Sequence, residues 1–283
     1  KLEHLELCHY VRQHFAVTSI NQRVAFLMNV FNGGLHALKS AAREQLGRER
    51  IEIQEIMVVP VSAQSYAEAL QMGDKIDHSL SELLSRQYGK SSIERGDEAG
   101  LTVKGLGKSD VAIEHVIQAV ERAGFAPKRD VQIALDVAAS TFYDKHQQTY
   151  HFQGGDLSSN QMVDKLLSLV DRHPGLFYSI EDGLAENDWT AWVTLTKALE
   201  PQGVKTIGDD LFVTQSPRLL RGIQMHAASA ILVKVNQNGS VYGTLKVVEQ
   251  AKLAGMEWVF SHRSGETLDE TIADLAYATK ALG

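Results

Sequence analysis

The chain has 283 residues and a formal net charge of -7 at pH 7, which argues against a nucleic acid or an anionic membrane as its general partner. Cys8 is the only cysteine, which excludes an intramolecular disulfide and is typical of a protein from a reducing, cytoplasmic compartment. No apolar stretch approaches the roughly 20 residues that cross a bilayer, so we expect no membrane partner. Small molecules are the expected partners, including a phosphorylated metabolite bound in a local basic pocket.

The first half of the chain predicts both helices and strands. In chain order these are a helix over residues 2–15, strands over 24–31 and 51–59, and helices over 65–88 and 110–123. The two strands end at turn signals, Gly33-Gly34 and Pro60. A glycine-bearing loop over residues 100–107 is expected between the last two helices.

Five short apolar runs in the second half each end on a residue that can do chemistry. The runs cover residues 131–135, 176–180, 204–208, 230–233 and 257–261, and the residues that follow or end them are Asp136, Glu181, Asp209, Lys234 and His262. Amphipathic stretches separate the runs, which favours repeated strand-helix units with buried parallel strands. In a strand-helix barrel the C-terminal strand ends meet at one face, where active sites lie. We therefore expect these five side chains to face one another.

The predicted fold class is α/β, with the chain forming a (β/α)8 barrel of the TIM type. Seven strands can be counted, so the eighth would have to follow Gly283, after a helix over residues 269–282. A polar insertion is expected around residues 144–160. We expect one main domain over residues 21–283, preceded by a stub over residues 1–20, and a chain that is truncated at both ends.

The three carboxylates at strand ends favour a divalent metal site. Asp136, Glu181 and Asp209 offer hard oxygen ligands, which suit Mg²⁺. The alternative is that each carboxylate caps the helix that follows it, and for any single one this interpretation is as well supported. Three carboxylates in successive units are harder to explain in that way.

Lys234 follows an otherwise apolar strand, which favours a role as a general base. Apolar neighbours and a nearby cation would lower the pKa of its amine. The alternative is an ion pair between Lys234 and one of the carboxylates. A metal beside such a lysine suggests abstraction of a proton next to a substrate carboxylate, with the cation stabilising the enediolate.

Eight segments of the chain resemble the signature segments of enolase and occur in the enolase order. They are NGGLHA (32–37), QE (54–55), GDEAG (96–100), ALDVAAS (134–140), SIED (179–182), GDDL (208–211), VKVNQ (233–237) and SHRSGET (261–267). The resemblance runs from about residue 29 to residue 281, and the last segment is the most diagnostic. The combination of a lysine base with Mg²⁺ is itself a known arrangement of the enolase superfamily, and the spacing alone does not derive it.

The resemblance implies a lyase, phosphopyruvate hydratase, which reversibly dehydrates 2-phospho-D-glycerate to phosphoenolpyruvate in glycolysis. It also implies a homodimer and specific roles for the matched residues. Mg²⁺ would be held by Asp136, Glu181 and Asp209; Lys234 would remove the proton alpha to the carboxylate; Glu98, beside Glu55, would act as general acid; His262, His36 and Gln54 would line the pocket; and Arg263 and Ser264 would bind the phosphate.

Two of these residues also have simpler interpretations. Glu98 lies between Gly96 and Gly100, which is typical of a mobile catalytic loop, but a solvated turn acid would give the same pattern. His36 follows two glycines and could equally be a turn histidine. Arg263 beside His262 indicates a basic pocket on chemistry alone.

The chain departs from the enolase pattern in the loops around the site. Leu35 stands where the family has serine, Ala99 where it has glycine, and Gly183 where it has proline. By the resemblance, we expect most of the α+β N-terminal capping domain of the family and its eighth strand to lie outside this sequence, and a polypeptide without both would have little hydratase activity. The alternatives are an enolase-like enzyme acting on a phosphonate or other altered substrate, and a non-catalytic enolase-like binding protein.

Overall fold

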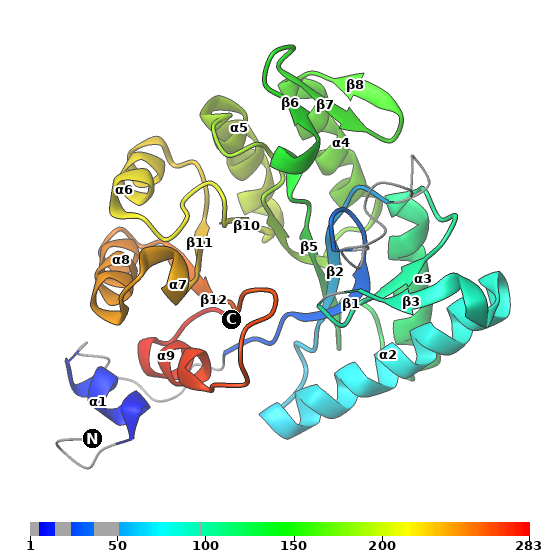
Figure 1. Cartoon of the computed structure of the whole chain (residues 1–283), viewed down its shortest axis with the longest axis horizontal. Helices are drawn as coiled ribbons and strands as arrows, with labels where there is room; N and C mark the ends of the chain where they lie inside the picture. The colour runs from blue at the N-terminus through cyan, green and yellow to red at the C-terminus, as the bar shows by residue number, and fades with distance from the viewer. Residues whose placement is uncertain (1–5, 15–23, 37–50, 97) are drawn as a thin grey trace.

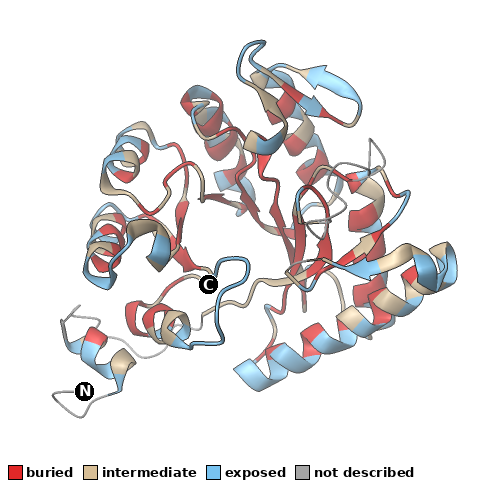
Figure 2. Ribbon diagram, in the orientation of Figure 1, coloured by how far each residue is buried: buried red, intermediate tan, exposed pale blue. Residues whose placement is uncertain are grey.

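The computed structural model describes residues 6–14, 24–36, 51–96 and 98–283. In this part of the chain the strands lie at the centre and the helices surround them (Figure 1). The strands are mostly buried, while the helices expose one side (Figure 2). No helix in the described ranges is long and apolar enough to cross a membrane. Of the predicted stub over residues 1–20, only residues 6–14 are described, and they include α1 (Leu7–His14).

A nine-stranded, mostly parallel sheet forms the centre. Its strands are β1 (Met28–Asn32), β2 (Glu55–Val59), β3 (Ile93–Arg95), β4 (Leu101–Val103), β5 (Gln132–Asp136), β9 (Phe177–Glu181), β10 (Lys205–Gly208), β11 (Ala230–Val233) and β12 (Glu257–Phe260). Their order in space is β12-β11-β10-β9-β5-β2-β1-β4-β3. Within this sheet, neighbouring strands among β5, β9, β10, β11 and β12 are parallel. In contrast, β2 is antiparallel to both β1 and β5. Each of the seven predicted strands is present in this sheet.

The helices after α1 cover the outside of this sheet. They are α2 (Tyr66–Tyr88), α3 (Ser109–Arg122), α4 (Ser159–Arg172), α5 (Trp189–Leu199), α6 (Ser216–Met225), α7 (Val235–Asn238), α8 (Val241–Leu253) and α9 (Thr271–Thr279), with short 3₁₀ helices η1 (Lys90–Ser92), η2 (Ala139–Phe142) and η3 (Glu200–Gln202). The apolar spacing of α2 explains its packing, because Ile76, Leu80 and Leu84 are all fully buried. Burial of each such side chain stabilises the fold by roughly 1.5–3 kcal/mol.

Serine caps explain where several helices begin. The Ser65 hydroxyl accepts a hydrogen bond from the backbone N–H of Glu68 at 3.2 Å, and Ser158 forms a capping box with Gln161 at the start of α4. Ser216, which precedes a proline as a helix cap could, does not cap α6. Ser216 lies inside the first turn of α6 with Pro217, and its hydroxyl bonds to a side chain of α8 instead.

The polar insertion predicted around residues 144–160 is a small antiparallel sheet. It consists of β6 (Tyr143–Asp144), β7 (Thr149–Phe152) and β8 (Gly155–Leu157). Tyr150 anchors it, because its ring is fully buried and its hydroxyl donates to Asp188 at the start of α5 over 2.8 Å. The strand pair β3–β4 was not predicted, since residues 101–103 were assigned to a loop.

A short stretch at residues 282–283 lies beside β12. No strand was predicted at these residues, because the eighth strand was expected after Gly283. The backbone of Leu282 donates to Trp258 of β12 over 2.8 Å and accepts from Ala25 over 2.9 Å. Phe260 of β12 also donates to the carbonyl of Gly283 over 3.0 Å. These bonds connect β12 to the segment that leads into β1. They do not form a continuous strand ladder in the described residues, so β12 and β3 remain the ends of the assigned sheet.

Candidate active site

One large cavity of about 1940 Å³ is lined by every site residue that the sequence predicted. These residues are His36, Gln54, Glu55, Glu98, Asp136, Glu181, Asp209, Lys234, His262, Arg263 and Ser264. They come from β2, from the C-terminal ends of β5 and β9, and from the loops that follow β1, β3, β10, β11 and β12. The expectation that the strand ends meet at one site therefore agrees with the structure.

A row of buried carboxylates crosses the floor of this cavity. Asp136 is the register partner of Glu181 on one side and of Glu55 on the other. Side chains at paired positions of neighbouring strands lie on the same face, about 5 Å apart. All three residues are less than 9% exposed.

Burial and mutual repulsion make this row electrostatically unfavourable without a cation. Burial, and then the neighbouring Glu55 carboxylate, raise the pKa of Asp136 to about 7. Burial, and then the charges of Asp136 and Asp209, hold the pKa of Glu181 well above its ordinary value. A divalent cation among these carboxylates would relieve the repulsion, so the donor set fits an oxygen-ligated metal such as Mg²⁺.

The Asp136 carboxylate is held in place by two donors. The side-chain amide of Gln54 donates to Oδ2 over 3.0 Å, and the backbone N–H of Ala138 donates to Oδ1 over 3.0 Å. Ala138 has a φ of +46°, in the left-handed region. This conformation turns the chain directly after β5, so that its amide faces back to Asp136.

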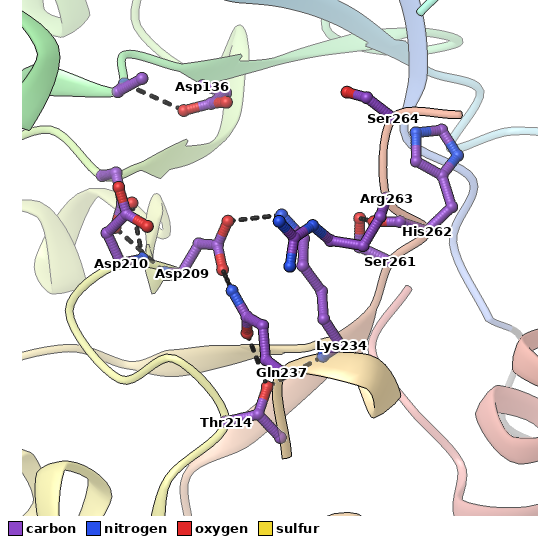
Figure 3. Close-up of polar contacts among 12 residues, drawn as sticks. Asp136, Asp209, Asp210, Thr214, Lys234, Gln237, Ser261, His262, Arg263 and Ser264 are labelled. Atoms are coloured by element: carbon purple, nitrogen blue, oxygen red, sulfur yellow. Dashed lines mark hydrogen bonds and ion pairs between the residues drawn. The ribbon is translucent and has the colours of Figure 1, made fainter. Parts of the chain in front are cut away.

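Lys234 forms an ion pair with Asp209, the third predicted metal ligand (Figure 3). Lys234 Nζ lies 2.5 Å from Oδ2 of Asp209, and the Gln237 side-chain amide donates to Oδ1 over 3.0 Å. Burial lowers the pKa of Lys234, but the carboxylates of Asp209 and Glu181 outweigh it and raise the pKa to about 12.

The predicted lowering of the Lys234 pKa is therefore wrong for this structure, and the alternative of an ion pair describes it. The prediction assumed a cation beside the amine, whereas the groups that surround Lys234 here are carboxylates. A cation bound to those carboxylates would cancel their attraction for the ammonium. The pKa of Lys234 would then be lowered instead of raised.

Asp182 is a buried carboxylate to which the sequence assigned no role. Its two carboxylate oxygens accept from the backbone N–H groups of Asp209 at 3.0 Å and Asp210 at 2.8 Å. Among the described residues, two groups have ligand atoms within 4.8 Å of one another and could hold a metal ion, and neither is the full predicted set of ligands. They are Asp182, Asp209 and Asp210, and His36, Glu55 and Glu98. The backbone bonds indicate that Asp182 mainly fixes the loop that carries Asp209. The only sequence signal was its place beside Glu181.

A second cluster of titratable groups surrounds Glu98, at the Glu55 end of the row. His36 Nδ1 lies 2.8 Å from Glu55, and His36 Nε2 lies 3.7 Å from Glu98. His262 Nε2 lies 3.0 Å from Glu98, and the hydroxyl of Ser264 donates to the same carboxylate. Glu98 is only 13% exposed, so the interpretation as a solvated turn acid is wrong.

The surroundings shift the pKa values of the two glutamates in opposite directions. Burial raises the pKa of Glu55, a hydrogen bond with His36 lowers it, and the hydrogen bond to Glu98 raises it again, so that the net shift is upward. Burial would also raise the pKa of Glu98, but hydrogen bonds from His262, Glu55 and Ser264 outweigh it and hold that pKa far below its usual range. The cluster therefore favours a proton on Glu55 over a proton on Glu98.

The backbone of the Glu98 loop is tied to its surroundings. Asn29 donates to the carbonyl of Glu98 over 3.1 Å, and Arg95 donates to the carbonyl of Ala99 over 2.6 Å. A Cβ at Gly96 would lie 2.2 Å from the amide nitrogen of Asn32, and a Cβ at Gly100 would lie 2.3 Å from its oxygen. Close packing against Asn32 therefore explains both glycines, without a hinge.

Arg263 brings an unpaired cation to the cavity (Figure 3). It follows β12 in an exposed loop, and its guanidinium has no hydrogen-bond partner among the residues that the structure describes. Ser264 and His262, its neighbours, are both bonded to Glu98. The arrangement can bind an anion beside a carboxylate-rich metal site.

Comparison with known families agrees with this geometry. The family model described as the enolase C-terminal TIM barrel domain matches residues 24–282 of the chain. Members of the enolase superfamily are lyases or related enzymes that use a divalent metal, in keeping with the acidic clusters here. The match spans most of the chain, and the chain therefore belongs to the family of enolase C-terminal TIM barrel domains.

Proposed function

We propose that this protein dehydrates 2-phospho-D-glycerate to phosphoenolpyruvate in a Mg²⁺-dependent reaction that begins with removal of the proton alpha to the carboxylate. The observation that carries the proposal is the single cavity that contains a carboxylate row, a lysine, the Glu55–Glu98 pair and an unpaired arginine. Each of these groups matches one requirement of this elimination.

Asp136, Glu181 and Asp209 would hold the metal. When bound, Mg²⁺ supplies positive charge that stabilises the enediolate formed after proton removal. The raised pKa values of Asp136 and Glu181 support this assignment, because the Lys234 ammonium does not offset the burial of these carboxylates and their repulsion. Gln54, which donates to Asp136, keeps that carboxylate oriented toward the cavity.

The base and the acid lie at opposite ends of the carboxylate row. Lys234 pairs with Asp209 at one end, and Glu98 lies with Glu55 at the other. An elimination needs this separation, since the proton leaves one carbon and the hydroxyl leaves the next. Lys234 would take the alpha proton once its ammonium is neutralised, and Glu98, beside Glu55, would give a proton to the departing hydroxyl as general acid.

Arg263 and Ser264 would bind the substrate phosphate. The guanidinium offers paired N–H donors that match phosphate oxygens, and it is unpaired in the described structure. His36 and His262 border the same region through their contacts with Glu55 and Glu98. The phosphate would thus sit near the acid end of the row, beside the leaving hydroxyl.

The test is the rise in ultraviolet absorbance that accompanies phosphoenolpyruvate formation, measured with the full chain, 2-phospho-D-glycerate and MgCl₂. The proposal expects a rate that requires Mg²⁺ and disappears in Lys234→Ala. Calorimetry with MgCl₂ alone provides the control, because a protein that binds the metal without turnover is not a hydratase. That outcome would favour an enolase-like binding protein.

One observation favours a second candidate, an enolase-like enzyme for a phosphonate or other altered substrate. Leu35 lines the cavity next to His36 and is 40% exposed, so it presents an apolar surface where the family has a serine. Turnover of a phosphonate analogue that exceeds turnover of 2-phospho-D-glycerate would support this candidate. Leu35→Ser should then shift the preference toward 2-phospho-D-glycerate.

A further inference from the structure

Two consecutive residues in the loop after β10 have left-handed backbone conformations. Val213 has a φ of +44° and Thr214 a φ of +51°. Both are β-branched, and such residues rarely adopt this region because the Cβ crowds the following carbonyl. Strained conformations persist where the surroundings fix them, and they are frequent at functional sites. Thr214 is also completely buried.

The hydroxyl of Thr214 makes two hydrogen bonds whose directions can be assigned. It accepts from the backbone N–H of Lys234 over 2.9 Å, because that N–H can only donate. Its single hydrogen is therefore free for Oε1 of Gln237, which lies 3.0 Å away. The Thr214 carbonyl also accepts from the side-chain amide of Asn238 over 3.0 Å.

These bonds determine which way the Gln237 amide points. With Oε1 taken by the Thr214 hydroxyl, the amide nitrogen faces Asp209 and donates to Oδ1 over 3.0 Å. Reversal of the amide would place two oxygens together at Asp209. Gln237 therefore presents a donor to one side of the Asp209 carboxylate, while Lys234 Nζ occupies the other at 2.5 Å.

Together the contacts form a closed ring of hydrogen bonds, seen in Figure 3. The ring passes from the Lys234 backbone to Thr214, to Gln237, to Asp209, and back to the Lys234 amine. It connects the backbone of the proposed base to the carboxylate of a proposed metal ligand. Asp209 and Thr214 come from the loop after β10, whereas Lys234 and Gln237 come from the end of β11 and from α7, which follows it.

We propose that Thr214 is a positioning residue for this site. Its hydroxyl fixes the Lys234 backbone and, through Gln237, the orientation of the Asp209 carboxylate. The assignment rests on the proposed function for the roles of Lys234 and Asp209, whereas the ring itself is a feature of the fold. A purely structural threonine would stabilise the loop without affecting how Asp209 meets a metal.

Thr214→Val tests this, because valine keeps the shape and the β-branch but removes the hydroxyl. It leaves the Lys234 N–H without its acceptor and frees the Gln237 amide to turn. Thr214→Ser restores the hydroxyl and serves as the rescue. Thr244→Val is the matched control, since Thr244 is equally buried and its hydroxyl donates to the carbonyl of Ser240, the residue that caps α8, while Thr244 does not line the cavity.

The measurements are Mg²⁺ affinity by calorimetry, kcat and KM with 2-phospho-D-glycerate, and the thermal midpoint. We expect Thr214→Val to weaken Mg²⁺ binding and to lower kcat, each by about tenfold, with KM changed less than about threefold. Thr214→Ser should recover both to within about threefold. Thr244→Val should lower the thermal midpoint without changing either. If Thr214→Val does not fold, Gln237→Met replaces it, because this substitution removes only the amide. We expect it to weaken Mg²⁺ binding and to lower kcat in the same way.

The proposal is overturned if Thr214→Val binds Mg²⁺ and turns over as Thr244→Val does, or if Thr214→Ser fails to recover both values. Failure of the proposed function has a different signature. In that case the unmodified chain shows no turnover, yet Mg²⁺ affinity still drops in Thr214→Val and returns in Thr214→Ser.

Discussion

Asp136 and Glu181 are register partners on the adjacent parallel strands β5 and β9, and both carboxylates are buried, with the Lys234 ammonium offsetting only part of their repulsion. Two such groups raise each other's pKa, because each charge disfavours ionisation of the other. The fold therefore retains an unfavourable pair at the centre of the cavity. Such a pair is best explained by a ligand that neutralises it.

This pair predicts how the stability of the metal-free protein depends on pH. The folded pKa of Asp136 is about 7, above its ordinary 3.8, so the folded state binds more protons between about pH 4 and pH 7. The contribution of Asp136 to the free energy of unfolding is fully present below about pH 4 and is lost as the pH rises through about 7. The folded pKa of Glu181 is raised too and acts in the same direction.

We expect the free energy of unfolding in EDTA to fall between pH 5 and pH 7.5, by about 1.4 kcal/mol for each pKa unit that the pair contributes in that range. Urea unfolding at the two pH values measures it. MgCl₂ should remove most of the loss, and Glu181→Gln should flatten the pH dependence without metal. Equal stability at both pH values in EDTA would contradict the description of the pair.

Arg218 should hold the metal-ligand loop in place. Its guanidinium donates to the carbonyl of Leu211 over 2.5 Å and to the carbonyl of Glu186, and it lies 5.2 Å from the centre of the Trp189 ring. Arg218→Ala leaves both carbonyls without a charged donor. We expect a loss of about 2–3 kcal/mol in urea unfolding, with weaker Mg²⁺ binding because Leu211 follows Asp209 closely.

The control for Arg218 is its neighbour Arg221. Arg221 also lies over the Trp189 ring, at 4.5 Å, but makes no hydrogen bond to a loop carbonyl in the described part of the chain. Arg221→Ala should therefore cost about 0.5–1 kcal/mol and leave Mg²⁺ affinity unchanged. Equal effects of the two substitutions would show that the hydrogen bonds from Arg218 to the two carbonyls contribute neither to stability nor to Mg²⁺ affinity.

Ala99 should be strained, because its φ is +64° in the loop of Glu98. Glycine adopts this conformation readily, whereas alanine loses roughly 1–2 kcal/mol there. Ala99→Gly should raise the free energy of unfolding by about 0.5–1 kcal/mol after the greater entropy of the unfolded chain is subtracted. Ala123→Gly, at a φ of -73°, should instead destabilise. A stability loss in Ala99→Gly would show that the loop relaxes in solution.

The strand ends of the site could be predicted because buried parallel strands leave a strong pattern in the sequence. Asp136, Glu181 and Lys234 each follow a short, mostly apolar run, so the barrel rule was enough to bring them to one face. β3 and β4 leave no such pattern, since each has three residues and β3 is largely exposed. The antiparallel direction of β2 was likewise invisible in its apolar run.

The partners of the site residues could not be predicted, because they depend on backbone conformation and on charges far apart in the chain. The role of Thr214 rests on a left-handed φ and on Lys234, which lies twenty residues away. The pKa of Lys234 depends on which carboxylates fold around it. Apolar neighbours and an assumed nearby cation suggested a lowered pKa, whereas the carboxylates raise it.

The central claim is that Lys234 removes a proton alpha to a carboxylate in a Mg²⁺-dependent step. The most direct test is exchange of the alpha proton of 2-phospho-D-glycerate for deuterium, followed by proton NMR in D₂O. We predict exchange that requires MgCl₂ and is lost in Lys234→Ala, while calorimetry shows that this variant still binds Mg²⁺. Exchange at the same rate in Lys234→Ala, or its absence from a Mg²⁺-bound unmodified chain, would contradict the claim.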